Sequence, residues 1–136
     1  MNEALLQAYR DTEYLVCLDP VEWTCITIDQ PLTDSLQRKV GANDWGFITA
    51  WNPLSEACVL ADNLAAQRAL FADLTAIPAA SMFAAIGIGR SGWYEPSLFA
   101  IGVDQPTLDV LGRRYHQHAY VYGNGTDPAR LRVLSA

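Results

Sequence analysis

The fold is decided by the stretch at residues 82–103, which reads MFAAIGIGRSGWYEPSLFAIGV. Its two short apolar runs, residues 82–88 and 98–103, have the length and composition of inner strands of a sheet. The segment between them, GRSGWYEP at residues 89–96, is the most polar and glycine-rich loop of the chain. This stretch therefore predicts two buried strands joined by a polar loop.

Upstream of this pair, the apolar residues change from helical to alternating spacing. Asn2 is suited to cap a short amphipathic helix that ends near Asp11. Residues 14–18 then alternate as in a strand, the Asp-Pro pair at residues 19–20 favours a turn, and residues 23–28 form the hairpin partner. The first part of the chain thus predicts one helix followed by a β-hairpin.

The middle of the chain predicts a buried strand and the longest helix. WGFITAW at residues 45–51 has the aromatic and β-branched content of a buried strand. A helix is predicted over residues 56–76, with Leu54 and Val59 as a hydrophobic staple at its start. The core-facing side of this helix is expected to carry the apolar residues Leu60, Leu64, Phe71 and Leu74.

Two shorter helices and two strands complete the prediction. Helices are expected over residues 33–41, which a glycine closes, and after Asp104, which is suited to cap one. Strands are expected at residues 119–122 and 131–134, the last at an edge of the sheet. The pattern as a whole predicts the α+β class, with a mixed, mostly antiparallel sheet of about five to seven strands flanked by three helices in a single domain.

Length and composition are those of one globular domain over residues 1–136. The chain is 51% hydrophobic and 18% charged, far from the composition of disordered chains. Its longest apolar run, residues 79–88, is much shorter than the roughly 20 residues that span a bilayer, and the first residues lack the pattern of a secretory signal. Three cysteines without CxxC spacing favour reduced thiols. We therefore expect a cytoplasmic protein without a membrane segment or a metal site.

The acidic charge is concentrated in the first half of the chain. Residues 1–68 hold ten acidic and four basic side chains and residues 69–136 hold five of each, so the whole net charge of −6 lies in the first half. The few, scattered basic residues do not form the cationic cluster that binds duplex nucleic acid. An acidic half of this kind is suited to docking on a basic protein surface.

Gly87, Gly89 and Gly92 formally match the dinucleotide-binding fingerprint. The match lacks the structural context of that fingerprint. In a dinucleotide-binding site the third glycine opens a helix, whereas another predicted strand follows here. We interpret the loop as a plain strand connection, with an anion cradle beside Arg90 as the alternative.

Two further patterns match reactive sites only in part. Cys58 is predicted in the first turn of the long helix, where the helix dipole lowers the pKa of a thiol, but no base is placed beside it. His116 and His118 share one face of a predicted strand, yet no third metal ligand accompanies them. We interpret Cys58 as a small buried thiol and the two histidines as a half-exposed strand entry.

Glu95 has the most unusual position of the carboxylates. It lies between Tyr94 and Pro96 in the polar loop, directly before a buried strand. Burial there raises the pKa of a carboxyl group, whereas a partner such as Arg68 or Arg90 keeps it ionised. Both a functional carboxyl group and a structural ion pair therefore stay open.

Several polar motifs occur together in an order that resembles one known family. The motifs are AYRDTEY at residues 8–14, ITAWNP at 48–53, Asn63 with Arg68, WYEPS at 93–97 and QHA at 117–119. Over nearly the whole chain they resemble the bacterial domain-of-unknown-function family 3293. The resemblance implies a small stand-alone protein and brings no established activity or cofactor.

The residues in these motifs are mostly polar groups at strand ends, helix starts and loops, where binding clefts form. The resemblance implies as ligand-binding candidates Thr49, Asn52, Asn63, Arg68, Trp93, Ser97 and Gln117. Glu95 is the candidate catalytic residue, as general acid or base. In this hypothesis Arg68 holds an anionic group of the substrate, and Asn52 and Gln117 orient it. Trp93 forms a wall of a cleft where the strand at 45–51, the long helix and the polar loop meet.

Two functional hypotheses follow from these observations. The first is a small-molecule-binding or catalytic cleft. The second is an acidic interaction module, such as an inhibitor or antitoxin-like protein, without enzymatic activity. The same polar residues also fit a purely structural network in which Glu95 pairs with Arg68. A deep polar cleft would favour the first hypothesis, and a broad acidic face the second.

Overall fold

The stretch that decides the fold forms the central hairpin of the sheet. Strands β4 (Ser81–Ile88) and β5 (Tyr94–Ile101) pair antiparallel in this structure, a computed structural model that describes residues 1–134. The turn between them is tighter than predicted, because the Gly89 N–H donates a hydrogen bond to the Trp93 carbonyl at 2.7 Å. As a result, part of the predicted loop already belongs to β5.

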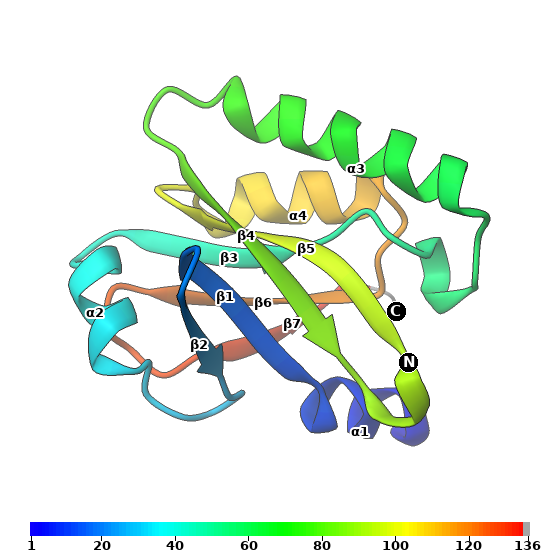
Figure 1. Ribbon diagram of the computed structural model, residues 1–136, viewed down its shortest axis with the longest axis horizontal. Helices are drawn as coiled ribbons and strands as arrows, with labels where there is room; N and C mark the ends of the chain where they lie inside the picture. Colours follow the sequence, from blue (N-terminus) through cyan, green and yellow to red (C-terminus); the bar gives the residue numbers. More distant parts are fainter. Residues whose placement is uncertain (135–136) are drawn as a thin grey trace.

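The whole sheet is curled and antiparallel, with the strand order β2-β1-β4-β5-β3-β6-β7 (Figure 1). Its other strands are β1 (Glu13–Asp19), β2 (Glu22–Ile26), β3 (Asp44–Ile48), β6 (Ala119–Asn124) and β7 (Arg130–Val133). The α-helices are α1 (Glu3–Asp11), α2 (Asp34–Val40), α3 (Leu60–Thr75) and α4 (Gln105–Arg114). The predicted α+β class is confirmed, with antiparallel pairing throughout the described strands. All four segments expected to be helical form α-helices, one more than the three helices expected to flank the sheet.

The helices divide between the two faces of the sheet. In Figure 1, α3 and α4 lie together on one face, while α1 and α2 lie apart from them, towards opposite ends of the sheet. One cluster of buried residues joins Ile48, Ala100 and Tyr120 of the sheet to the two long helices. A second cluster on the other face includes Phe47 and Phe99 and is completed by α2. The alternation along each strand thus supplies two separate cores.

The long helix begins later than predicted. It was expected over residues 56–76, but α3 starts at Leu60, and its N-cap residue Val59 makes no side-chain capping bond. The preceding segment is tied down instead, because the Cys58 N–H donates to Asn52 Oδ1 at 3.1 Å. The predicted staple is wrong, since Leu54 and Val59 are both exposed. Cys58 is also exposed, so its interpretation as a small buried thiol is wrong.

The core-facing side of α3 also differs from the prediction. Of the four apolar residues expected in the core, only Leu74 is buried, while Leu60, Leu64 and Phe71 are exposed: 63%, 36% and 48%. The buried residues of this helix are Asn63, Leu70 and Leu74. The inward face therefore begins with a polar residue, which is why a search for an apolar stripe selected another side of the helix.

The shorter elements agree with the sequence. Asn2 caps α1 by accepting a hydrogen bond from the Leu5 N–H at 2.8 Å. Asp104 caps α4 in the same way, accepting from the Thr107 N–H at 2.9 Å. Strand β7 is an edge strand, as predicted. Within residues 1–134, no helix has the length and apolar character required to cross a membrane.

Candidate functional site

One face of the sheet changes from apolar to polar along its strands. On β5 the residues that point to the α2 side run from Ile101 and Phe99 to Ser97 and then Glu95, because alternate residues of a strand share a face. Phe47 is followed on the same face by Thr49. These polar groups follow directly on buried aromatic residues, so they lie at the floor of a cavity and not on an open surface.

A glycine that lines the cavity stands opposite Glu95. In the sheet, Gly87 of β4 is paired with Glu95 of β5 on one side and with Tyr14 of β1 on the other. A Cβ atom at Gly87 would lie 3.5 Å from Thr12 Cγ2, an ordinary contact distance, so a methyl group fits between the sheet and Thr12, the residue that follows α1. Tyr14 and Glu95 therefore face each other across a position without a side chain.

The space between α1 and the end of the sheet is a cavity of about 550 Å³. Its volume lies within the range of about 300–1,000 Å³ that is typical of small-molecule sites. Helix α1 supplies one wall through residues that include Ala4, Leu5, Ala8 and Tyr9. The polar lining from the rest of the chain includes Thr49, Ser55, Arg90, Glu95, Ser97 and Gln117. Strand-end residues from β1, β4 and β5, together with residues next to β3 and β6, therefore converge on one space.

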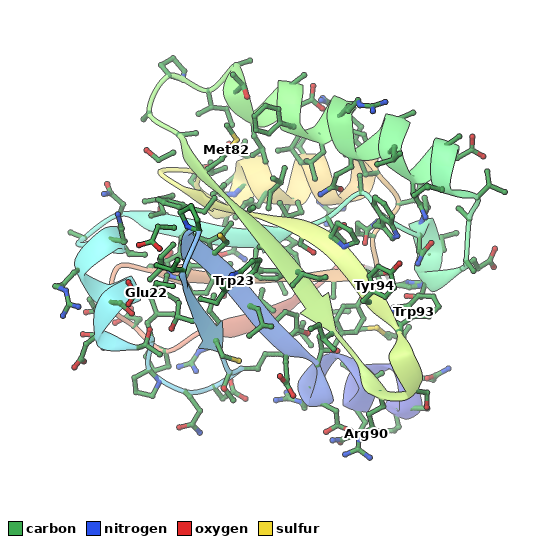
Figure 2. All side chains as sticks on the ribbon, viewed as in Figure 1. Glu22, Trp23, Met82, Arg90, Trp93 and Tyr94 are labelled. Carbon is green, nitrogen blue, oxygen red and sulfur yellow. The ribbon has the colours of Figure 1, made fainter. Side chains whose placement is uncertain are left out.

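Helix α1 covers the cavity without being part of a core. None of its residues is buried, and it is held by polar contacts at its C-terminal end. Arg10 binds Asp29 at 2.8 Å, and Asp11 lies 3.5 Å from Arg90. Figure 2 shows Arg90 beside α1, with its side chain directed away from the sheet. The helix that covers the cavity is thus held by ion pairs of its last two residues, Arg10 and Asp11.

The Glu95 carboxyl group is the ionisable group on the cavity floor. Burial raises the pKa of Glu95 from its usual value near 4.5 to about 7, and hydrogen bonds from the side chains of Asn52 and Trp93 lower it only in part. Among the described residues, no basic side chain forms an ion pair with it. Both protonation states of Glu95 are therefore populated near neutral pH.

Two tyrosines stand over this carboxyl group. Burial raises the pKa of Tyr9 to about 12, and the negative charge of Glu95 contributes to the increase. The pKa of Tyr14 is also raised, by burial first and then by Tyr9, and its hydroxyl donates to the Tyr9 carbonyl at 2.5 Å. Neither phenol ionises near neutral pH, so Glu95 alone changes charge there.

A buried pair of asparagines lies next to Glu95, and one of them, Asn52, donates a hydrogen bond to its carboxyl group. Asn52 and Asn63 are 7% and 3% exposed. Asn63 Oδ1 accepts from the Asn52 backbone N–H at 2.8 Å, and Asn63 Nδ2 donates to Asn52 Oδ1 at 2.9 Å. This pairing fixes the rotation of the Asn52 side chain, which leaves its amide N–H groups available to Glu95. Asn63 thus acts through Asn52 and does not line the cavity.

The structure brings together most of the residues that the resemblance implied. Thr49, Trp93, Ser97 and Gln117 line the cavity together with Glu95. Asn52 is adjacent through its contact with Glu95, and Asn63 supports Asn52. Arg68 is different, because it is exposed on α3 and neither lines the cavity nor pairs with Glu95. The anion-holding role expected of Arg68 therefore has no geometric basis at this cavity.

The sequence reasoning missed the contribution of the first fourteen residues. The cleft was expected where the strand at 45–51, the start of the long helix and the polar loop meet, but its wall is α1, and α3 contributes no lining residue. Tyr9, Thr12 and Tyr14 all line the cavity, and all three stand in the AYRDTEY segment. That segment was the available signal, since it was among the motifs on which the resemblance rested.

The comparisons with known proteins agree with the polar motifs. The model of the family described as "Protein of unknown function (DUF3293)" matches residues 48–120. This span includes the ITAWNP, WYEPS and QHA motifs, while the AYRDTEY segment lies outside it. No curated protein and no solved structure is significantly similar to the chain. The site therefore has to be interpreted from its own geometry.

Proposed function

The chain belongs to the DUF3293 family of unknown function, and we propose that it binds a small molecule under α1, where the Glu95 carboxyl group is the ionisable group that contacts the ligand. One observation carries this proposal: a half-buried carboxyl group without an ion-pair partner in residues 1–134 faces a cavity of about 550 Å³. A structural carboxylate would have a basic partner, because an unpaired buried charge costs stability. A carboxyl group with a pKa near the pH of the cell is suited to general acid or base catalysis.

The acidic surface of the first half has less support. Asp29 is held by both Arg10 and Arg130, at 2.8 and 3.3 Å, and Asp11 faces Arg90 at 3.5 Å. These arginines neutralise part of the acidic charge locally, so the charge asymmetry of the sequence does not translate into an equally acidic face. A cleft with a proton-exchanging group is the better-supported of the two functions.

A ligand screen with cavity variants tests the proposal. The purified protein is heated with single compounds from a panel of amines, alcohols, carboxylates, nucleobases and sugar phosphates. A compound at about 100 times its Kd adds about 2.7 kcal/mol of stability, which raises the Tm by on the order of 10 °C. We expect at least one class to produce such a rise, and we expect Glu95→Gln to abolish it. Glu56→Gln is the matched control, because Glu56 is exposed and lies outside the cavity.

The opposite glycine offers a second pair of variants. A methyl group at Gly87 meets Thr12 only at a contact distance of 3.5 Å, so Gly87→Ala is expected to keep the ligand-induced rise in Tm. Gly87→Leu extends further into the cavity and is expected to remove it. Equal rises in Gly87→Ala, Gly87→Leu and Glu95→Gln would show that the ligand binds elsewhere and would contradict the proposal.

A further inference from the structure

The cavity has a charge that selects among ligands. Glu95 contributes the ionisable group of the floor, and the only basic side chain among the described lining residues is Arg90. The side chain of Arg90 is 82% exposed at the rim and faces Asp11. An anionic ligand would therefore meet an acidic floor in a partly desolvated space without a cation to offset it. The floor favours a neutral or positively charged ligand.

Three polar side chains of the cavity have their donors already used within the protein. Thr49 already donates to the Pro96 carbonyl at 2.7 Å, and Ser97 donates to the Glu95 carbonyl at 3.0 Å. The Gln117 side-chain amide donates to the Trp51 and Tyr115 carbonyls, both at 3.2 Å, which leaves its oxygen as the free group. These three side chains therefore offer acceptor atoms, which are complementary to a ligand that brings donors.

Part of the apolar lining is aromatic, beside aliphatic residues such as Leu5 and Val121. Tyr14 and Phe47 pack edge to face, with ring centroids 5.2 Å apart, and both line the cavity with Tyr9 and Trp93. Aromatic faces attract cations and also accept the apolar body of a ligand. The acidic floor, the free acceptor atoms and the aromatic side chains in the walls therefore favour the same kind of ligand.

We propose that the ligand class of this cavity is a protonated amine on a small apolar body, with its ammonium group bound to the Glu95 carboxylate. The ammonium group supplies three donors, which complement the Gln117 side-chain oxygen and the acceptor sites of Glu95 that the hydrogen bonds from Asn52 and Trp93 leave free. This inference rests on the proposed function, because it names the ligand class of the same cavity.

Binding then depends on pH through Glu95. Its carboxyl group has to ionise, so affinity falls about tenfold between pH 8 and pH 6 for a pKa of about 7. The other titratable and charged groups that face it are Tyr9 and Asp11 from α1, Tyr14 from β1 and Arg90 from the turn. Both phenols stay neutral in this pH range, and Asp11 and Arg90 pair with each other.

The test uses matched amines, alcohols and carboxylates on benzyl, phenylethyl and butyl bodies, with the Kd of each measured by titration calorimetry. We expect the best amine to bind at least tenfold more tightly at pH 8 than its matched alcohol, and the carboxylates not to bind. Glu95→Gln is expected to remove both the preference for the amine and the pH dependence, whereas Glu56→Gln keeps both. In wild type at pH 6, two buffers of different ionisation enthalpy are expected to show that amine binding releases close to one proton.

Alcohols or carboxylates that bind as tightly as the amines would overturn the amine assignment. If Glu95→Gln or Gly87→Leu still weakens the binding of these compounds, the proposed cleft itself stands. Failure of all three amines to bind would also overturn it. A broad panel without any binder sensitive to these variants would overturn the proposed function as well.

Discussion

Glu95→Gln is expected to stabilise the protein at pH 8, by about 2 to 3 kcal/mol more than it does at pH 5. The physical reason is that the folded state holds the Glu95 carboxyl group in a half-buried position, where no basic side chain of the described part of the chain pairs with it. Ionised Glu95 is therefore a cost to folding, and a neutral amide of the same size removes that cost.

The direction of the pH dependence follows from proton binding. Burial raises the folded-state pKa of Glu95 to about 7 from about 4.5. Between these values the folded protein keeps a proton that the unfolded chain has released, so the contribution of Glu95 to stability decreases as the pH rises through this window. The Glu95→Gln variant does not lose stability in this way, so the difference between its free energy of unfolding and that of the wild type grows from pH 5 to pH 8.

Urea unfolding of both proteins at pH 5 and pH 8 measures this difference. Glu56→Gln serves as the control, because Glu56 is exposed and its substitution is expected to change stability little at either pH. If Glu95 instead held a structural ion pair, Glu95→Gln would destabilise the protein at pH 8. That result would contradict the account of the site.

Asn63→Ala is expected to lower the free energy of unfolding by about 3 kcal/mol, although alanine has the higher helix propensity. Asn63 is buried and makes two hydrogen bonds to Asn52, at 2.8 and 2.9 Å. Removal of its amide leaves the Asn52 N–H without its acceptor and takes a donor from Asn52 Oδ1. Buried polar groups that lose their partners cost more than the hydrogen bonds themselves contribute.

Asn43→Ala is the matched control for this variant. The Asn43 side chain is exposed and donates one hydrogen bond, to the Val40 carbonyl at 3.1 Å. We expect it to cost about 1 kcal/mol or less. Equal losses for Asn63→Ala and Asn43→Ala in urea unfolding at pH 7 would show that the Asn52–Asn63 pair does not support the site.

The elements of the fold were largely predictable, because their signals are local. The helix cap at Asn2, the hairpin in the first part of the chain and the two inner strands around residues 89–93 all follow from residues near in sequence. The start of α3 was not predictable in this way. It depends on Asn52 and Asn63, which are eleven positions apart and make a contact that no local pattern encodes.

The candidate site was predictable in its residues more than in its shape. Glu95, Ser97 and Thr49 lie on the same face as buried aromatic residues, and their alternation is visible in the sequence. The position of α1 over them was not visible, because an amphipathic helix with no buried residue gives no signal of what it covers. The exposed position of Arg68 was missed because the buried side of α3 carries Asn63, Leu70 and Leu74 and is not the apolar stripe that the sequence suggested.

The most direct test of the central claim is the pH titration of the Glu95 carboxyl carbon by NMR. The chain has five glutamates, and the spectrum of Glu95→Gln identifies the resonance by its absence. Because the claim is that Glu95 is an unpaired, proton-exchanging group on the floor of a cavity, we expect a midpoint of about 7 in the free protein. A midpoint near 4.5 or below would mean that the carboxylate is solvated or paired, and it would contradict the claim.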